Sequence, residues 1–392
     1  MKQKLKDMKN KKTILIITGG YFPGVNFGGI ATSRYNFTEA FGDKYDIVII
    51  TRNHDYKTDK PFKNITTGYN QYGKARVLYF SDKDFNGSTF GKIMDELGPD
   101  FIYCSGTITT YFHFNKNVLD EAKKRNIPVL ITPDGDVLDN AMRHKPLKKI
   151  GAALACRLSS AFKDVWFQAT TPGEVKNLPK YLGIKPEKIA LIPNMPCIFK
   201  PRTNHTKEAG KLRVVFASRI HPIKNLLFAI ECVCQLKQDV AFDIFGSLED
   251  EAYWEECQKA ISKAPQNIKI TYKGRLDSDK AREIAKGYDC FFLPTTTENY
   301  GYVIEEALIS GCPVIISRGT TPWDDVHNIA GFTAKLGDSR AFVAELEKIA
   351  DMDNTQYDTY CSGVRSYIEK KLSFDQLCED YRKLFNKIIK NH

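Results

Sequence analysis

Two glutamates, Glu298 and Glu306, stand eight positions apart on either side of a short loop that contains Gly301. A carboxylate is repelled by phosphate, whereas it readily accepts hydrogen bonds from hydroxyl groups. The pair therefore suits the hydroxyls of two sugars, one a ribose and the other a hexose. The alternative is that both are solvated acids at the start of a helix.

The hydrophobic pattern around these glutamates predicts the elements that position them. Residues 290–293 form an apolar strand, an apolar helical run begins at Ala307, and the β-branched residues 314–316 form a second buried strand. In a parallel α/β sheet, ligands bind where the chain leaves the carboxyl end of a strand to start a helix. A helix N-terminus there offers N–H groups and a positive dipole end, which suit phosphate.

A pair of cations follows another predicted strand, 212–218. Arg219 and Lys224 stand in the loop after this strand. A planar guanidinium can bind two phosphate oxygens, and an ammonium group adds a point charge. Because negative charge develops on a departing diphosphate, such contacts strengthen in the transition state and raise the rate as well as the affinity. The alternative is a solvated basic loop.

Two glycine doublets mark a third candidate site, after the first predicted strand at 13–18. Gly28 and Gly29 directly precede a predicted helix over 30–41, and Gly19-Gly20 lies in the same loop. Glycine lets backbone N–H groups approach an anion closely, and a helix start adds its dipole. Gly28 and Gly29 are therefore the candidate phosphate contacts, with a plain turn as the alternative.

The string TENYGYVIEEALISGCPVIIS begins at Thr297, and the triplet Thr321-Pro322-Trp323 follows it. Together they closely resemble the C-terminal signature of the retaining family 4 glycosyltransferases. These enzymes have the α/β fold called GT-B, in which two Rossmann-like domains with doubly wound parallel sheets face a cleft. Glu298 and Glu306 fall at the two glutamate positions of the signature, and Glu305 is an extra acid. The resemblance spans nearly the whole chain and is sharp in its second half.

The resemblance implies a role for each candidate residue. Glu306 would hold the ribose hydroxyls of a nucleotide donor, and Glu298 would contact hydroxyls of the transferred sugar. Arg219 and Lys224 match the cations that grip the donor diphosphate, and Gly28–Gly29 matches a doublet that faces the same phosphates. The further donor contacts that we expect are Asn299, Tyr300, Gly301, Tyr302 and Val303.

Asp134 departs from the family pattern. It follows the predicted strand 127–131, at a place where relatives usually carry His-Gly or Arg-Gly near the donor sugar. An acid here would repel a phosphate and accept from hydroxyls or an amine. Asp134 is therefore a candidate contact to the acceptor or the sugar, and the alternative is an ordinary turn aspartate.

The length of 392 residues favours two domains. The segment Pro193–Pro196 marks the clearest boundary, so we expect an N-terminal domain over 1–198 and a C-terminal nucleotide-sugar-binding domain over 199–373. The resemblance implies that the last helix crosses back, so that 374–392 belongs with the first domain. Further strands are expected near 46–51, 76–80, 100–104, 165–169, 189–192, 241–245 and 268–272.

Composition excludes several classes of protein. The ten cysteines are scattered without paired spacing, which indicates a reducing compartment and cysteines used as small hydrophobes. No apolar run reaches the roughly 18 residues of a spanning helix. No His or Cys spacing predicts a metal site, and no nucleic-acid-binding motif is present. We therefore expect a cytoplasmic enzyme that uses no metal or other cofactor.

Positive charge gathers in the first half of the chain. Residues 1–200 hold 31 Lys and Arg against 19 Asp and Glu, whereas the remaining residues hold 26 against 28. The segment 143–163 predicts a basic amphipathic helix that begins at Pro146. Its apolar face carries Leu147, Ile150, Leu154 and Leu158. Such a helix can bind an anionic surface on the cytoplasmic side of the membrane, each cation adding about 1 kcal/mol, unless the stripe simply packs on the sheet.

The resemblance, together with these residues, implies a retaining, metal-independent hexosyltransferase that moves a sugar from a nucleotide diphosphate donor to an acceptor hydroxyl. The expected donor is a UDP-sugar, and a GDP-sugar is the second choice. The expected acceptor is a polysaccharide or a lipid-linked glycan. One alternative is a catalytically idle GT-B partner of another glycosyltransferase, and the other is a nucleotide-sugar epimerase of the same fold. The intact cations and glutamates argue against the first, and no catalytic acids of the second can be identified.

Overall fold

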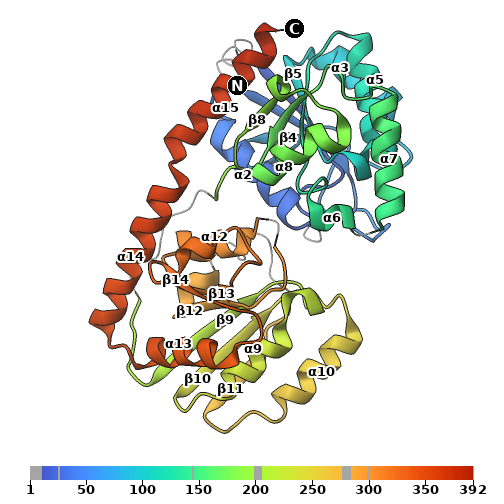
Figure 1. The fold of residues 1–392 in the computed structure, drawn as a ribbon. Coiled ribbons are helices and arrows are strands. Elements are labelled where there is room, and N and C mark those ends of the chain that lie inside the picture. The colour runs from blue at the N-terminus through green and yellow to red at the C-terminus, as the bar shows by residue number, and fades with distance from the viewer. Residues whose placement is uncertain are drawn as a thin grey trace. The chain divides into compact units, whose positions relative to one another are not determined.

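The structure is a computed structural model that describes residues 11–24, 27–143, 145–197, 205–275, 284–298 and 300–391. The chain divides into two compact units (Figure 1). Unit 1 comprises Met1–Met195 with Phe374–His392, and unit 2 comprises Pro196–Ser373. The division falls within the proline-containing segment 193–196, and the last helix, α15 (Phe374–Lys390), belongs to unit 1.

Unit 1 is built on an eight-stranded sheet with the order β3-β4-β2-β1-β5-β6-β7-β8. Its strands are β1 (Thr13–Ile17), β2 (Asp46–Arg52), β3 (Asn70–Tyr72), β4 (Ala75–Phe80), β5 (Phe101–Ser105), β6 (Val129–Thr132), β7 (Trp166–Ala169) and β8 (Ile189–Leu191). The strand pairs are parallel except β3 with β4, which form an antiparallel edge. The strand order reverses between β1 and β5, which makes this the switch point of the sheet.

Both faces of this sheet are buried. Ile14 and Ile16 of β1 belong to one core cluster, and the alternating Leu15 and Ile17 belong to the other. The ring of Phe37 in α2 packs against rings of α15 on the first of these faces. The helices of unit 1 are α2 (Gly29–Phe41), α3 (Gly87–Leu97), α4 (Ile108–Thr110), α5 (Lys116–Lys124), α6 (Asp139–Arg143), α7 (Pro146–Leu158), α8 (Pro172–Asn177) and α15.

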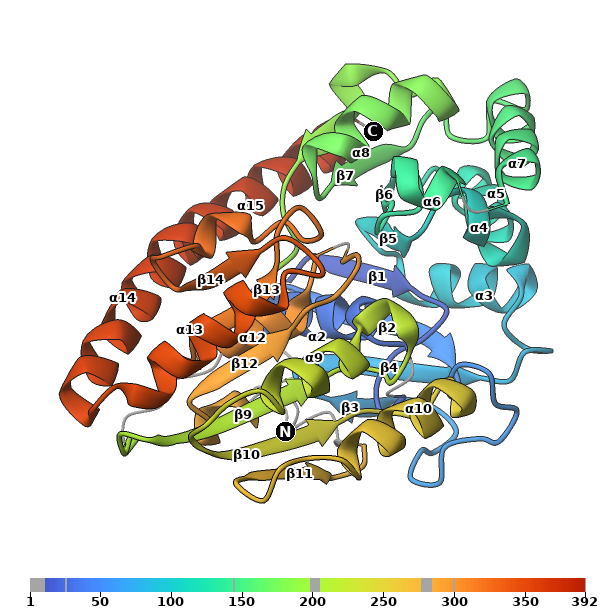
Figure 2. The same cartoon turned by 60° about the horizontal axis from the view of Figure 1, so that its bottom comes forward.

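Unit 2 has a six-stranded parallel sheet with the order β11-β10-β9-β12-β13-β14 (Figure 2). Its strands are β9 (Lys211–Ala217), β10 (Asp239–Phe245), β11 (Ile268–Tyr272), β12 (Cys290–Leu293), β13 (Val314–Ser317) and β14 (Gly331–Ala334). Its helices are α9 (Leu226–Val233), α10 (Glu251–Ile261), α12 (Tyr302–Ile309), α13 (Ser339–Asp351) and α14 (Asn354–Leu372). α9 packs against α10 and α13, and α12 packs against α14.

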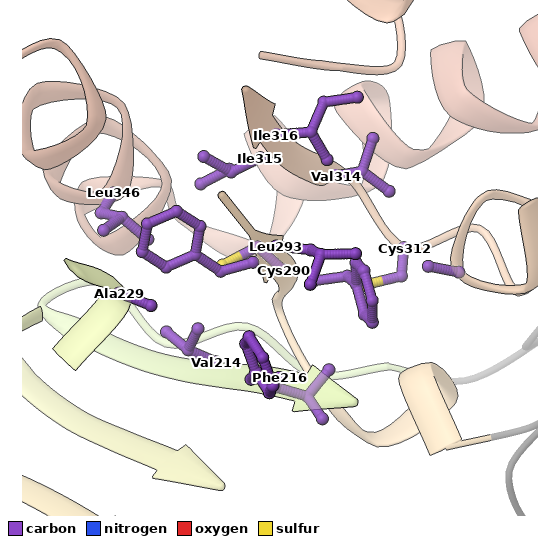
Figure 3. Packing of buried hydrophobic residues seen from close by; sticks show 14 of the residues in the cluster. Val214, Phe216, Ala229, Cys290, Leu293, Cys312, Val314, Ile315, Ile316 and Leu346 are labelled. Carbon is purple, nitrogen blue, oxygen red and sulfur yellow. The ribbon is translucent and has the colours of Figure 1, made fainter. Parts of the chain in front are cut away.

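The core of unit 2 is made of short apolar runs, as expected for parallel strands that are buried on both faces. Figure 3 shows Phe216 of β9, Cys290 of β12 and Ile315 of β13 together with Leu346 of α13, and all four are fully buried. Burial raises the pKa of the Cys290 thiol well above its ordinary value. The described cysteines are free thiols, most of them buried, so they serve as small hydrophobes.

Candidate functional site

The candidate site of unit 2 lies at the switch point of its sheet. β10 lies on one side of β9 and β12 on the other, so the loops that leave β9 and β12 diverge there. Ligands of open α/β sheets bind outside the carboxyl ends of the strands at such a point. Lys224 follows β9, and Glu298 follows β12. The two loops are joined by a hydrogen bond of 2.8 Å from Thr296 N to Ile223 O.

Lys224 and Glu298 form an ion pair, with the ammonium Nζ in direct contact with Oε1 of the carboxylate. Their side chains are only 8% and 13% exposed. Each charge therefore compensates the other in a place that is largely shielded from water. A diphosphate that reached Lys224 would compete with Glu298 for the ammonium group, and it would leave the carboxylate to accept from hydroxyls.

Arg219 lies in the same loop as Lys224 but is half exposed, and its Nη1 donates to Glu249 Oε2 at 2.7 Å. Glu249 follows β10 and is not among the predicted site residues. The loops after β9 and β10 approach closely at Gly246, where a Cβ would lie 1.8 Å from Ser218 O. Each predicted diphosphate cation thus already has one carboxylate partner.

α12 carries Glu306 and the extra acid Glu305. Glu305 is fully buried, its Oε1 accepts from Cys197 N at 3.1 Å, and the Tyr300 hydroxyl contacts its Oε2. Burial raises the pKa of Glu305 to about 8, so this carboxyl is mostly protonated at neutral pH. Glu306 is 8% exposed, and Cys197 Sγ donates to its Oε1 at 3.5 Å. The first residues of unit 2 are therefore anchored to the helix that carries the predicted ribose contact.

The loop before α12 is shaped by Gly301 and Trp323. Gly301 is the N-cap residue of α12 with φ +81°, in the region that favours glycine. Trp323 is almost fully buried, and its Nε1 donates to Tyr300 O at 2.6 Å. The tryptophan of the Thr-Pro-Trp triplet is therefore buried against the predicted donor loop and hydrogen-bonded to its backbone. In the described part of the chain, no side chain caps α12, so the positive end of its dipole faces this loop.

The other predicted donor contacts occupy the same loop and the first turn of α12. Tyr302 and Val303 are the first two residues of the helix, and both are partly buried. The rings of Tyr300 and Tyr302 lie 4.7 Å apart between centroids. Asn299 lies outside the described residues. Contact of these residues with a donor stays a prediction.

In unit 1 the glycine candidates follow β1, at the switch point of the sheet. Gly28 is the N-cap residue of α2 with φ +56°, and a Cβ there would meet no atom within 4 Å. The conformation, and not the space, therefore requires glycine. Gly29 is the first residue of α2, and no described side chain caps this helix.

Asp134 is held by a buried arginine that the sequence analysis did not single out. Arg34 Nη2 lies 3.1 Å from Asp134 Oδ2, and the two side chains are 1% and 9% exposed. The same guanidinium donates to Ser105 Oγ at 3.0 Å and to Tyr103 OH at 2.8 Å. Burial raises the pKa of Asp134, against the opposing effect of Arg34. Asp134 also has φ +50°, which fits the turn interpretation.

The turn that carries Asp134 is fixed by a second buried acid, Glu174. Its Oε1 accepts from Gly135 N at 2.6 Å, and its Oε2 accepts from Thr170 N at 2.6 Å. Glu174 is fully buried at the start of α8. The turn is therefore rigidly positioned at the carboxyl end of β6. Contact of Asp134 with an acceptor or sugar stays a prediction.

The amphipathic helix predicted within 143–163 is α7, but its apolar stripe does not pack on the sheet. The buried face is formed by Ala153 and Cys156. The exposed fractions of the stripe are 89% for Leu147, 52% for Ile150, 53% for Leu154 and 77% for Leu158. The alternative interpretation, in which this stripe packs on the sheet, is therefore wrong. Among the helices in the described part of the chain, none is long and apolar enough to cross a membrane.

Groups of three or more His, Cys, Asp or Glu side chains placed to hold a metal ion are absent from the described residues. The positive charge of the unit 2 site comes from Arg219 and Lys224, in the loop after β9. These cations and the helix N-terminus are the groups in the described site that could stabilise a bound phosphate.

Part of unit 2 matches a known family of protein domains. Residues 211–352 match the family described as Glycosyl transferases group 1. Unit 2 therefore contains a Glycosyl transferases group 1 domain. A probable sucrose-phosphate synthase from Thermosipho melanesiensis is 26% identical over 223 residues, which are 53% of this chain and 50% of that protein. The chain thus spans about half the length of this curated relative.

Solved structures share the architecture over nearly the whole chain. HepE from Anabaena, in complex with UDP and glucose, matches with a TM-score of 0.71 at 16% identity, over 96% of this chain and 100% of that one. Sucrose-phosphate synthase from Thermosynechococcus elongatus matches with a TM-score of 0.66 at 13% identity, over 97% and 100%. The fold is GT-B, with two Rossmann-like parallel-sheet domains, and the expected fold class is confirmed.

Proposed function

We propose that this protein is a retaining glycosyltransferase that moves a hexose from a UDP-sugar to an acceptor hydroxyl. The observation that carries the proposal is the contact of Lys224 with Glu298 at the switch point of the sheet in unit 2. This contact supports the proposal because an ammonium group can bind phosphate and a carboxylate can accept hydrogen bonds from hydroxyls. The Glycosyl transferases group 1 domain supports sugar transfer, and the UDP and glucose bound by HepE support the choice of donor.

The cations supply the electrostatic part of catalysis. Arg219 and Lys224 hold the donor diphosphate, and each charge-assisted hydrogen bond contributes about 1.5–3 kcal/mol. The bond between the sugar C1 and the diphosphate oxygen breaks, and its electron pair stays on the diphosphate. The acceptor oxygen then bonds to C1 on the same face, and its proton passes to a diphosphate oxygen. Since the cations balance the growing charge, this reaction needs no metal ion.

The two glutamates divide the recognition of the donor between them. Glu306 accepts hydrogen bonds from the ribose hydroxyls, and Glu298 accepts them from the hexose. When the diphosphate binds Lys224, it displaces the Glu298 carboxylate from the ammonium group. The freed carboxylate can then accept hydrogen bonds from the hexose, so diphosphate binding and hexose binding are coupled. The loop that contains Tyr300 and Gly301 lies between them and completes the donor contacts.

The acceptor is a polysaccharide or a lipid-linked glycan. The exposed apolar stripe of α7, flanked by lysines and arginines, supports an acceptor presented at an anionic surface on the cytoplasmic side of a membrane. The enzyme would then act as a peripheral protein that meets its nucleotide sugar in the cytoplasm.

The experiment that tests the function is incubation with a panel of UDP- and GDP-sugars, with and without glycan and lipid-linked acceptors. Release of UDP that depends on an acceptor, with a product of unchanged anomeric configuration by NMR, supports the proposal. Conversion of one nucleotide sugar into its epimer without an acceptor would indicate the epimerase. Absence of turnover with every donor and acceptor, restored only in the presence of another glycosyltransferase, would indicate an idle partner.

A further inference from the structure

A cavity of about 280 Å³ opens beside the C-terminal end of α7. Its lining includes the apolar residues Phe162, Leu182 and Ile184. Four cations also line it, namely Arg157, Lys163, Lys185 and Lys188, and its lining contains no acidic residue. The lining therefore combines a strong positive charge with a smaller apolar part, which suits a single anionic group carried on a molecule with an apolar part.

The cations of this cavity are partly fixed in position. The Arg157 guanidinium donates to Lys180 O at 3.5 Å, and the Lys188 ammonium lies 4.2 Å from the centroid of the Trp166 ring. Lys185 lies 4.0 Å from a carboxylate oxygen of Glu187, with both side chains mostly exposed to water. A surface pair of this kind is weak, so Lys185 can turn to another anion at little cost.

The cavity adjoins the exposed apolar stripe of α7 through Arg157. Arg157 lines the cavity, and it stands in the helix directly before Leu158 and three positions after Leu154. Residues three positions apart are neighbours on a helix surface, so the cation borders the stripe. Figures 1 and 2 both draw α7 at the outer rim of unit 1. The exposed stripe and the cavity-lining Arg157 therefore belong to one helix at the edge of this unit.

We propose that α7 and this cavity form one membrane-docking face, in which the stripe enters the interface of an anionic bilayer and the cavity holds the phosphate of one anionic phospholipid. An interfacial helix buries its apolar side about 5–10 Å into the boundary of headgroups and acyl chains. Cations that border the stripe then lie at the level of the phosphates. This inference rests on the proposed membrane partner of the enzyme and not on its transfer chemistry.

A second copy of the chain fits this face less well than lipid does. An isologous dimer would bring the same patch of each copy together, and with it two sets of four cations. Like charges placed against each other oppose association, whereas a surface of anionic lipid attracts every one of them. The charge of the cavity therefore selects the lipid surface.

Vesicle flotation of the full-length protein tests the proposal. The vesicles are pure phosphatidylcholine or equal parts of phosphatidylcholine and phosphatidylglycerol. The stripe variant is Leu154→Gln with Leu158→Gln, and the cavity variant is Lys163→Glu. Lys148→Glu changes the same charge on α7 outside the cavity, and Lys259→Glu changes it on α10 of unit 2. The substituted side chains are exposed, so the variants are expected to keep the wild-type melting temperature.

We expect the wild type to float with the phosphatidylglycerol vesicles and not with the neutral ones. The stripe variant should lose binding, and Lys259→Glu should keep it. A cation near an anionic surface is worth about fivefold in binding, and a Lys→Glu substitution removes one cation and adds one anion, so Lys148→Glu should lose about 25-fold and Lys163→Glu at least about tenfold more. Equal losses for these two variants would remove the cavity from the proposal. Wild-type protein that ignores the vesicles and instead dimerises through the stripe, as measured by light scattering, would overturn it entirely.

The same preparations separate this inference from the proposed function. UDP binding by the stripe and cavity variants, measured by calorimetric titration, should equal that of the wild type, because α7 belongs to unit 1 and the donor residues Lys224, Glu298 and Glu306 to unit 2. Flotation without UDP binding would leave the docking face intact and contradict the glycosyltransferase. UDP binding without flotation would contradict the docking face and leave the proposed glycosyltransferase function intact.

Discussion

Lys224 and Glu298 contact each other across the switch point of the unit 2 sheet, although 74 positions separate them in the chain. The two side chains neutralise each other's charge. In addition, Lys224 is predicted to bind the diphosphate of the donor, and Glu298 is predicted to bind its hexose. In the proposed function, the binding of a donor exchanges one partner of Lys224 for another. The pair is a structural element as well as a candidate catalytic one.

Stability measurements can separate these two roles. Lys224→Ala leaves the largely buried Glu298 carboxylate without its partner, so we expect a loss of about 3–5 kcal/mol in the free energy of unfolding. Lys224→Ala combined with Glu298→Gln removes both charges and should recover most of this loss while remaining inactive. Denaturant unfolding of the single and double variants measures the effect. A double variant as unstable as Lys224→Ala would show that the pair is not what stabilises these loops.

Arg219 offers the opposite case, because its side chain is half exposed. Arg219→Ala should keep the melting temperature of the wild type. Its kcat/KM should fall by roughly a hundredfold or more, which corresponds to a loss of about 2–4 kcal/mol in transition-state stabilisation. The matched control is Glu249→Gln, which removes the carboxylate that competes for Arg219 and should not weaken donor binding. Near-wild-type turnover by Arg219→Ala would exclude it from the diphosphate site.

The raised pKa of Glu305 should make the free energy of unfolding depend on pH. Burial raises its pKa to about 8, whereas an unfolded chain titrates a glutamate near its ordinary value of 4.5. Between these values the folded protein holds a proton that the unfolded chain releases. The free energy of unfolding should therefore fall as the pH rises, by up to about 1.4 kcal/mol per pH unit, and level off above the folded pKa.

Glu305→Gln isolates this contribution. The amide keeps an acceptor for Cys197 N–H and carries no charge at any pH. Denaturant unfolding across this pH range should therefore lack the slope that the wild type shows. An unchanged slope in the variant would assign the pH dependence to another group.

Asp134 can be tested in the same way, with stability and transfer measured side by side. Asp134→Asn leaves the buried Arg34 guanidinium without a counter-charge and should cost about 3–5 kcal/mol. The exposed Asp120→Asn, in an ion pair on α5, should change stability by less than about 1 kcal/mol. If Asp134→Asn unfolded like the wild type but failed to transfer sugar, the residue would instead be a contact to the acceptor or the sugar.

The buried strands could be predicted from the sequence because each is an apolar run bounded by turn residues. The predicted strands at 268–272 and 290–293 have the observed bounds, and the segment 374–392, expected to hold the last helix, contains α15. Two short strands at sheet edges, β3 and β14, were missed. β3 is the polar triplet Asn70–Tyr72 and buries little, and β14 begins at Gly331, whose small size lets it approach Val314 O closely. Neither has a hydrophobic pattern that would reveal it.

The site residues could be placed after their strands, but their partners could not. The contacts of Arg219 with Glu249, of Cys197 with Glu305 and of Arg34 with Asp134 join positions that lie 30 to 108 residues apart. Such pairs depend on how loops close over a sheet, and a hydrophobic pattern carries no information on this. The pattern of α7 likewise shows which residues share a face, but not whether another element covers that face.

Calorimetric titration of UDP, in the presence of a chelator, tests the central claim most directly. The wild type should bind UDP without a divalent cation. Glu306→Gln should bind it at least about tenfold more weakly, because a charge-assisted contact to the ribose is lost. Glu298→Gln should bind UDP at least as well as the wild type, because Glu298 acts on the hexose and its removal releases Lys224 for phosphate. No UDP binding by the wild type, or equal losses for the two glutamate variants, would contradict the account.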